Sequence, residues 1–369
     1  MNNSKKHNSN NERIKHKYYR FLKEAKRLSE ASIDGVAMSI SRFEHYGNHK
    51  DFKAFHFEQA VAFKKNLECQ TSKQTGKPLS KATINSSLRY LKSFFQWLSQ
   101  ESGYKSRLNY TDMEYFNLSE KDTRIATAKR ERRVPTVEQV LHVIGSMGSD
   151  TPIERRNRAL IAFTLLSGAR DSAIASMKLK HVDTVQDRVI QDAREVNTKN
   201  SKTFISDFFP VDGLIREIVV DWISYLKTEH LFGNDDPLFP KTAMRQNDNK
   251  EFEAYGLLKE CWSTANPIRT IFKSAFEDAG LEYFNPHSFR KTLVGLGQRI
   301  CQNPEEFKAW SQNLGHENVL TTYLSYGEVQ PQRQSEIFKR LKEPKQPMKT
   351  NYDVGELAIA IAKEMGKKS

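Results

Sequence analysis

Apolar side chains recur at three- and four-residue spacing through most of this chain, and this periodicity restricts it to a mainly helical fold. The pattern first runs from Ile14 to about Leu118. Its clearest part is a helix from about Lys81 to Ser99, with a stripe of Ile84, Leu88, Leu91, Phe95 and Leu98. We therefore predict a helical domain over residues 14–118, preceded by a disordered basic tail over residues 1–13.

A second domain is expected after a basic linker. Residues 119–134 have little apolar content, so they separate the first domain from one over residues 135–345. Thr136-Val137-Glu138-Gln139 has the spacing of a capping box, which would open the first helix of that domain. The stretch from Arg158 to Met177 is helical around a break at Ser167-Gly168.

The pattern changes between residues 182 and 211. Strands are predicted there by Val189, Ile190, Val196, Phe204, Ile205, Phe208 and Phe209. Turn-forming residues at 197–201 would connect them. Helical patterns return from Leu214 to Leu226 and continue, with polar loops at residues 232–236 and 245–250. The predicted fold class is mainly α with a small antiparallel β-sheet.

Residues 346–369 combine a proline-containing linker with one more short helix. Asp353 would cap this helix, and its apolar stripe is Val354, Leu357, Ile361 and Met365. Because a linker precedes it, the helix can pack on its own subunit or be exchanged with a neighbouring one.

The net charge of +13 favours a nucleic-acid partner. The charge is spread through foldable sequence, whereas a membrane-binding protein would more often confine it to one amphipathic helix. Candidate DNA contacts are Lys81, Arg89 and Lys92 on the predicted helix, and Lys129, Arg130, Arg132 and Arg133 in the linker. A solvated face is at least as good an interpretation of the helix residues, and a merely solvated charge run or a nuclear-import signal are the alternatives for the linker.

Several other classes of protein are disfavoured. No apolar run is long enough to span a bilayer, and the polar, Asn-rich N-terminus does not have the pattern of a secretory signal. Cys69, Cys261 and Cys301 are far apart and fit neither a disulfide framework nor a metal site. We interpret them as buried small hydrophobic residues in a reducing compartment.

Phosphate chemistry is suggested by a set of residues in the second domain. His287–Arg290 is followed by Leu314–His316 and by Tyr326, with Arg170 far upstream. Two arginines can clamp a phosphate because the planar guanidinium matches its oxygens and stays charged, and a tyrosine hydroxyl can attack one. Metal nucleases need clustered carboxylates, whereas the acids here are dispersed. We therefore expect DNA strand cleavage without a metal or other cofactor.

Four sequence blocks resemble those of the tyrosine recombinases, or phage-type integrases, and the resemblance covers about residues 14–345. The blocks are Thr164–Arg170, Ser201–Thr203, His287–Arg290, and Leu314–His316 with Thr321-Thr322 and Tyr326. Each block alone is weak evidence for the resemblance, but four blocks in this order are strong evidence. The resemblance implies a two-domain C-shaped clamp around DNA, with a helical core-binding (SAM-like) domain and a tyrosine recombinase catalytic domain.

The resemblance also implies a role for each catalytic residue. Arg170 and Arg290 would clamp the scissile phosphate. His287 would assist proton transfer or hold the phosphate, and His316 would hydrogen-bond a non-bridging oxygen. Lys202, eight residues before Pro210 as in the family, would protonate the leaving 5′ oxygen. Lys199 remains an alternative for this role.

The sequence departs from the family at two positions. The most familiar members have the nucleophilic tyrosine nine residues after the histidine, where this chain has Ser325. We expect Tyr326 to attack, with Tyr323 as the runner-up. Ala173 occupies a position where the family usually has an acid that braces the site, so Asp171 would substitute or the brace would be absent.

The implied reaction is conservative site-specific recombination through a 3′-phosphotyrosyl link, without ATP. Four active sites on two duplexes imply a homotetramer on double-stranded DNA. An accessory directionality factor is a further candidate partner, and the expected location is the cytoplasm of a bacterium, at the nucleoid. A type IB topoisomerase is the first alternative, and a non-catalytic DNA-binding regulator with the same fold is the second.

Overall fold

The computed structural model describes residues 7–72, 76–128, 133–247 and 249–316. The chain divides into two compact units, Met1–Arg130 and Glu131–Ser369, each with its own hydrophobic core. The division lies within the stretch 119–134 where the sequence predicts a linker. Tyr323, Tyr326, Lys129, Arg130, Arg132 and the helix expected after Asp353 lie outside the described residues.

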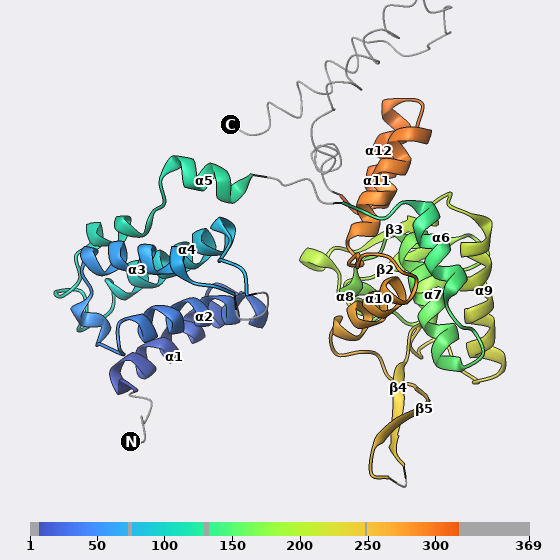
Figure 1. The fold of residues 1–369 in the computed structure, drawn as a ribbon, viewed down its shortest axis with the longest axis horizontal. Coiled ribbons are helices and arrows are strands. Elements are labelled where there is room, and N and C mark those ends of the chain that lie inside the picture. The colour runs from blue at the N-terminus through green and yellow to red at the C-terminus, as the bar shows by residue number, and fades with distance from the viewer. Residues whose placement is uncertain (1–6, 73–75, 129–132, 248, 317–369) are drawn as a thin grey trace, which may run out of the picture. The chain divides into compact units, whose positions relative to one another are not determined.

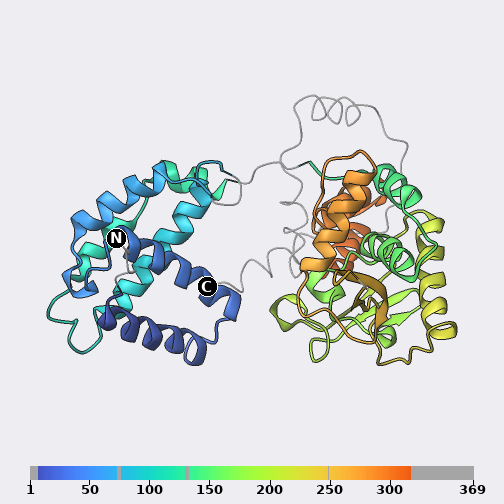
Figure 2. The same cartoon turned by 60° about the horizontal axis from the view of Figure 1, so that its bottom comes forward.

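Helices form the first unit around an aromatic core. They are α1 (Ser9–Glu24), α2 (Glu30–Tyr46), α3 (Phe57–Cys69), α4 (Lys81–Leu98) and α5 (Glu120–Thr127), with 3₁₀ turns at Phe52–Ala54 and Tyr110–Phe116. Figure 2 shows the blue-to-cyan helices of this unit crossing one another. α4 buries the stripe predicted from the sequence, and Phe95 at its centre stacks on Phe55 at 4.1 Å between ring centroids.

The start of α1 corrects the last part of the tail predicted as disordered, because residues 9–13 are helical. The helix begins at Ser9, because the Asn8 side chain accepts hydrogen bonds from the backbone N–H groups of Asn10 and Asn11. Asn11 is fully buried, and its amide donates to Glu44 at 3.0 Å. The polar composition suggests disorder, but Asn8 caps the helix and Asn11 forms a buried hydrogen bond.

Helix α5 occupies half of the stretch 119–134 that was predicted as a linker. Ser119 caps it by accepting from the N–H of Asp122, and it packs beside α4. None of its residues is buried, so its sequence has no apolar stripe to reveal it. Lys81 on α4 forms an ion pair with Asp122 at 3.0 Å, which helps to hold the two helices together.

The second unit is also mostly helical, with two small antiparallel sheets. Its elements are α6 (Val137–Ser146), α7 (Pro152–Ser167), α8 (Asp171–Ile174), β1 (Val182–Asp183), β2 (Arg188–Gln191), β3 (Phe204–Asp207), α9 (Gly213–Thr228), β4 (Lys241–Gln246), β5 (Phe252–Leu258), α10 (Asn266–Asp278), α11 (Ser288–Ile300) and α12 (Pro304–Asn313). The strands pair in the orders β1-β2-β3 and β4-β5. The predicted capping box of Thr136 and Gln139 is confirmed at α6.

Helix α7 is the centre of the second unit. Its last nine residues, Ala159–Ser167, are all buried, and the helix packs against α6, α9, α10 and α11. Gly168 ends α7 in the left-handed conformation, with φ of +60°, which confirms the break predicted at Ser167-Gly168. The chain therefore turns at a fixed corner in the core immediately before Arg170.

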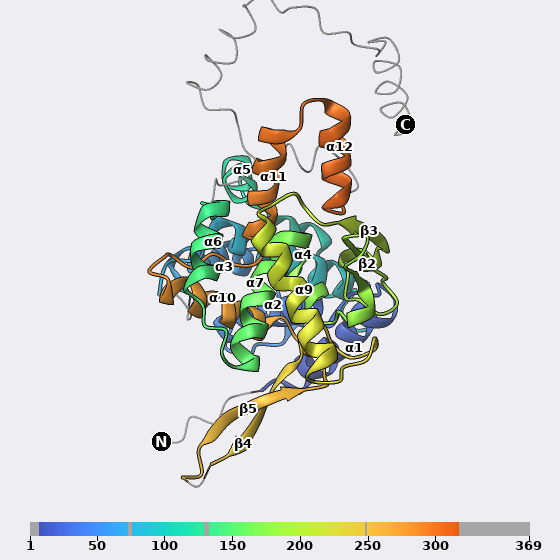
Figure 3. The ribbon, with the colours of Figure 1, turned by 90° about the vertical axis from the view of Figure 1, so that its right-hand side faces the viewer.

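The β4–β5 hairpin was not predicted, since the sequence suggested continuing helices with a polar loop at 245–250. Asn247 closes its turn by accepting hydrogen bonds from the N–H groups of Asn249 and Glu251. The hairpin extends away from the other elements of its unit (Figures 1 and 3). Because both faces are largely exposed, its strands lack the apolar alternation that identifies a half-buried sheet.

Two further sequence expectations can be compared with the described residues. None of the helices in these residues is long and apolar enough to cross a membrane. The cysteines are not buried as predicted, because Cys69 is exposed and Cys261 and Cys301 are half-buried. Cys69 lies at the end of α3, where its side chain is exposed, and Cys301 follows α11 and packs only partly against the core.

Candidate active site

Arg290, on the first turn of α11, joins three parts of the second unit. Only 4% of its surface is exposed. Its Nη1 donates to the carbonyl of Gly168 at 2.5 Å, and its Nη2 donates to the carbonyl of Leu314. Nη2 also lies 3.0 Å from Nε2 of His316. Three of the four blocks identified in the sequence therefore meet at this one guanidinium.

The charge of Arg290 is not balanced by any carboxylate among the described residues, since its hydrogen-bond partners there are two carbonyls and a histidine. Burial and the charge of Arg170 lower the pKa of Arg290 to about 9, so the group is still cationic at neutral pH. A buried cation without a counter-ion is costly. An anion bound beside the guanidinium would offset this cost.

Arg170 contributes a second positive charge beside Arg290. It immediately precedes α8 and is half-buried, and burial lowers its pKa. The backbone that positions it depends on Gly168, where an added Cβ would lie 2.9 Å from Leu314 Cδ2 and 3.0 Å from Phe209 Cε2. This close packing explains why the corner before Arg170 requires a glycine.

His316 must be a neutral acceptor towards Arg290. A guanidinium can only donate, so Nε2 of His316 accepts and the ring proton lies on Nδ1. Burial, and then the charges of Arg290 and Arg170, lower the pKa of His316 to about 4. Burial and the same two arginines also lower the pKa of His287. Neutral imidazoles of this kind can hydrogen-bond a phosphate or relay a proton.

Acid should destabilise the second unit partly through His316. The neutral ring contributes stability that is fully present above its ordinary pKa of 6.5 and is lost as pH falls towards about 4. We expect His316→Gln, which keeps an acceptor but cannot titrate, to lose less stability than the wild type between these pH values. The measurement is urea unfolding across this range, with the exposed His142→Gln as the matched control. Equal pH dependence in all three proteins would contradict the assignment.

The β2–β3 connection carries the two candidate lysines, Lys199 and Lys202. A 3₁₀ turn at Lys199–Ser201 precedes Lys202 and β3. Phe204 at the start of β3 packs under Gly315, where an added Cβ would lie 2.7 Å from its ring. The charge of Lys199 is one of those that lower the pKa of His316. Within the described residues no hydrogen bond or ion pair places Lys202 at the site, so both lysines remain candidates.

Asp171 does not brace the arginine–histidine cluster by any hydrogen bond among the described residues. Its Oδ2 accepts from Nε of Arg269 on α10 at 2.8 Å, and its Oδ1 accepts from the N–H of Ser172. Ala173, where an acid was expected, is buried in the core. Asp171 therefore fastens α8 to α10 and acts on His287 only through its charge, which raises that pKa.

The candidate DNA contacts on α4 are not equivalent. Lys81 forms ion pairs with Glu68 at 2.7 Å and Asp122 at 3.0 Å. Lys92 pairs with Glu114 at 2.7 Å. Arg89 is exposed, and none of the described residues forms an ion pair with it. In the second unit, the exposed Arg133 approaches Glu282 only at 4.0 Å.

Sequence reasoning missed the backbone groups that hold the site together. The carbonyls of Gly168 and Leu314 are the acceptors that orient Arg290. Asn313, at the end of α12, also fixes β3 by accepting from the N–H of Asp207 at 2.6 Å. Among these groups only Gly168 could be anticipated from the sequence, because a glycine after an apolar helix suggests a left-handed helix end.

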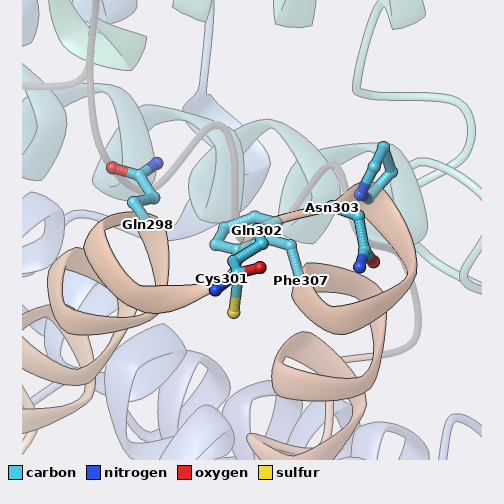
Figure 4. A pocket seen from close by; sticks show the side chains of 6 residues that line it. Gln298, Cys301, Gln302, Asn303 and Phe307 are labelled. Carbon is cyan, nitrogen blue, oxygen red and sulfur yellow. The ribbon is translucent and has the colours of Figure 1, made fainter. Parts of the chain in front are cut away.

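A pocket of about 240 Å³ lies between α11 and α12, at the opposite end of α11 from Arg290. Figure 4 shows the side chains around it, which include Gln298, Cys301, Asn303 and Phe307. None of its lining residues is charged, so it is not the phosphate site. Among the described residues no group of three or more His, Cys, Asp or Glu side chains could hold a metal ion.

Comparisons with known proteins identify the family of this chain. Residues 133–333 match the model of the phage integrase family. The chain is 22% identical over 322 residues to a tyrosine recombinase XerC from Bacillus pumilus, covering 86% of this chain and 92% of the relative. Because the family model matches more than half of the chain, the protein belongs to the phage integrase family, that is, to the tyrosine recombinases.

Solved structures share the fold. A lambda integrase dimer bound to a COC′ core site superimposes with a TM-score of 0.58 at 13% identity, covering 92% of this chain and 80% of that chain. The Tn1549 transposon integrase in complex with transposon right-end DNA gives a TM-score of 0.58 at 17% identity, covering 89% of this chain and 99% of that chain. The two-domain recombinase fold predicted from the sequence is thereby confirmed.

Proposed function

We propose that this protein is a site-specific DNA recombinase that cuts and rejoins double-stranded DNA through a covalent link to Tyr326. The observation that carries the proposal is Arg290. It is a buried cation that meets Gly168, Leu314 and His316 but no carboxylate among the described residues. A scissile phosphate would supply the missing negative charge, and Arg170 would bind its second oxygen.

The proposed reaction proceeds in two steps. Tyr326 gives its hydroxyl proton to the neutral His287 as its oxygen attacks the scissile phosphorus and forms the 3′-phosphotyrosyl bond, while the bond to the 5′ oxygen breaks and that oxygen takes a proton from Lys202. A 5′ hydroxyl from a partner duplex then returns a proton to Lys202 as it attacks the same phosphorus, and Tyr326 leaves and recovers its proton from His287. Arg170 and Arg290 stabilise the charge of each pentacoordinate state, and the neutral His316 donates through Nδ1 to a non-bridging oxygen. Because each step exchanges one phosphoester for another, no ATP is needed.

The assembly and location belong to the same proposal. Exchange of strands between two duplexes needs four active sites, so we propose a homotetramer on DNA. An accessory protein would set the direction of the reaction, and the site of action would be the bacterial nucleoid. The DNA partner is supported by the lambda integrase dimer bound to a COC′ core site and by the Tn1549 integrase in complex with transposon right-end DNA, which share this fold.

Strand exchange between two duplexes tests the function. Sites would first be captured from a pool of randomised duplexes as covalent protein–DNA adducts, and then placed on two labelled fragments of different length. We expect recombinant fragments to form in EDTA. Relaxation of supercoiled plasmid without joining of the fragments would favour a type IB topoisomerase instead. Absence of any covalent adduct would favour a non-catalytic DNA-binding regulator.

The general acid can be assigned by the choice of leaving group. We expect Lys202→Ala to slow cleavage of ordinary DNA by about a hundredfold or more, as loss of a general acid does. A substrate with sulfur in place of the 5′ bridging oxygen should restore its rate, because a thiolate leaves without a proton. Lys199→Ala is the matched control, and rescue of that variant instead of Lys202→Ala would reverse the assignment.

Arg89 should contribute more to DNA affinity than Lys81. Arg89→Ala is expected to weaken binding and to lower the slope of log affinity against log salt by about 0.9, because one phosphate contact is lost. Lys81→Ala should change the slope less, since Lys81 is already paired with Glu68 and Asp122. Titrations of labelled duplex at several salt concentrations measure both slopes. A larger change for Lys81→Ala would contradict this ranking.

A further inference from the structure

The β4–β5 hairpin exposes apolar side chains that have no role in the proposed strand cleavage. Its exposed apolar side chains include Met244, Tyr255 and Phe252, with exposed fractions of 52%, 56% and 76%. Met244 is paired with Ala254, and Gln246 with Phe252, so Met244 and Phe252 lie on one face of the ribbon. Such exposed apolar groups on an extended arm are typical of an interaction surface.

Several polar groups near the tip are engaged within the hairpin itself. Arg245 donates to Glu253 at 2.7 Å and lies 5.6 Å above the Tyr255 ring. The amide of Gln246 donates to the Lys250 carbonyl at 3.0 Å. Asn247 closes the turn. These contacts hold several polar groups within the hairpin, while Met244 and Phe252 stay exposed on one face, with Gln246 between them.

The charge of the hairpin also differs from that of the whole chain. Residues 241–260 contain the basic residues Lys241, Arg245, Lys250 and Lys259 and the acidic residues Asp248, Glu251, Glu253 and Glu260. These charges cancel, whereas the chain as a whole carries +13. A neutral surface gains little from a phosphate backbone. On a strongly basic protein it is instead a place where a second basic chain can approach without repulsion.

The hairpin is anchored firmly at its base. Arg156 on α7 is 3% exposed, and its Nη1 donates to the Pro240 carbonyl at 2.9 Å and to Thr242 Oγ1 at 2.8 Å. Its guanidinium also lies over the Trp262 ring at 5.3 Å. The same helix ends at Gly168, where Arg290 is held. The arm is thus fixed to the helix that leads into the catalytic corner.

We propose that the β4–β5 hairpin is a docking surface for a second copy of this chain. The occupant is a copy, because Met244 and Phe252 are exposed apolar groups and the neutral segment does not repel a chain that carries +13. Within the described residues β4 and β5 pair only with each other, which leaves their outer edges able to extend a sheet. The inference rests on the proposed recombinase function, which requires several copies on DNA. Contact with a neighbour through Phe252 and Met244 would stabilise the assembled complex and leave the binding of a single copy to DNA unchanged.

Photo-cross-linking identifies the occupant directly. The full-length protein would carry p-benzoylphenylalanine in place of Phe252 and be irradiated with and without duplex DNA bearing its captured site. We expect a covalent dimer of the chain that increases when DNA is present, and mass spectrometry of the joined peptides would locate the partner surface. Cross-links to DNA, or no cross-link in the presence of DNA, would overturn the proposal.

Substitutions test the consequence for recombination. We expect Met244→Asp combined with Phe252→Asp to reduce complexes containing two duplexes, and recombinant product, by about tenfold or more, as loss of an interface hot spot does. Binding to one site and formation of the covalent adduct should stay within about twofold. Val185→Asp, at a residue 91% exposed in the same unit, is the matched control and should change neither.

The outcomes separate this inference from the recombinase proposal. If the hairpin variant lost single-site binding, the hairpin would contact DNA and the inference would be wrong. If it recombined like the wild type, the hairpin would have no role in assembly. If the wild type formed no covalent adduct, the proposed function would fail, whereas the cross-linking result would still report whether copies meet at the hairpin. Thermal unfolding of each variant verifies that the fold is intact.

Discussion

Tyr326→Phe is expected to abolish the covalent protein–DNA adduct while leaving DNA binding intact. The substitution removes only the hydroxyl that would attack the phosphorus, and loss of a nucleophile typically costs about 10⁴-fold or more in rate. Suicide substrates, in which a nick lets the 5′ fragment diffuse away, trap the adduct for denaturing electrophoresis. Binding to the intact site, measured in parallel, should remain within about threefold of the wild type.

Tyr323→Phe is the control for this experiment. It removes the same hydroxyl group from a tyrosine three positions away, and we expect it to keep most of its cleavage activity. An adduct with Tyr326→Phe, accompanied by its loss with Tyr323→Phe, would transfer the nucleophile to Tyr323. Peptide mapping of the wild-type adduct gives an independent assignment.

Arg290→Lys is expected to slow strand cleavage by about a hundred- to a thousandfold. The guanidinium donates to the carbonyls of Gly168 and Leu314 and to His316, and it must also meet the phosphate. A lysine ammonium has three donors and no planar fork, so it cannot serve these acceptors and a phosphate together. The measurement is the single-turnover rate of adduct formation at saturating enzyme.

Arg299→Lys provides the matched control, since Arg299 is an exposed arginine on the same helix. It should cleave at the wild-type rate. Because Arg290 also ties α11 to the Gly168 corner, thermal unfolding and binding of Arg290→Lys must be compared with those of the wild type. A fully folded Arg290→Lys protein that cleaves normally would contradict the phosphate clamp.

Local signals in the sequence predicted the parts of the structure that are held by local forces. The apolar stripe of α4, the capping box of Thr136 and Gln139, and the glycine break after α7 all depend on residues within one or two turns of each other. Elements without such signals were missed. Helix α5 buries nothing and the β4–β5 hairpin is exposed, so neither produces a hydrophobic period.

The sequence by itself determined the family, the catalytic unit and the identity of most candidate site residues, because four motif blocks keep their residue types and their order. The tertiary structure decided how those residues behave. That Arg290 is buried without a carboxylate among the described residues, that His316 is neutral, and that Asp171 pairs with Arg269 follow from segments far apart in the chain. Charge state depends on burial and on neighbours in space, and only the folded chain brings these together.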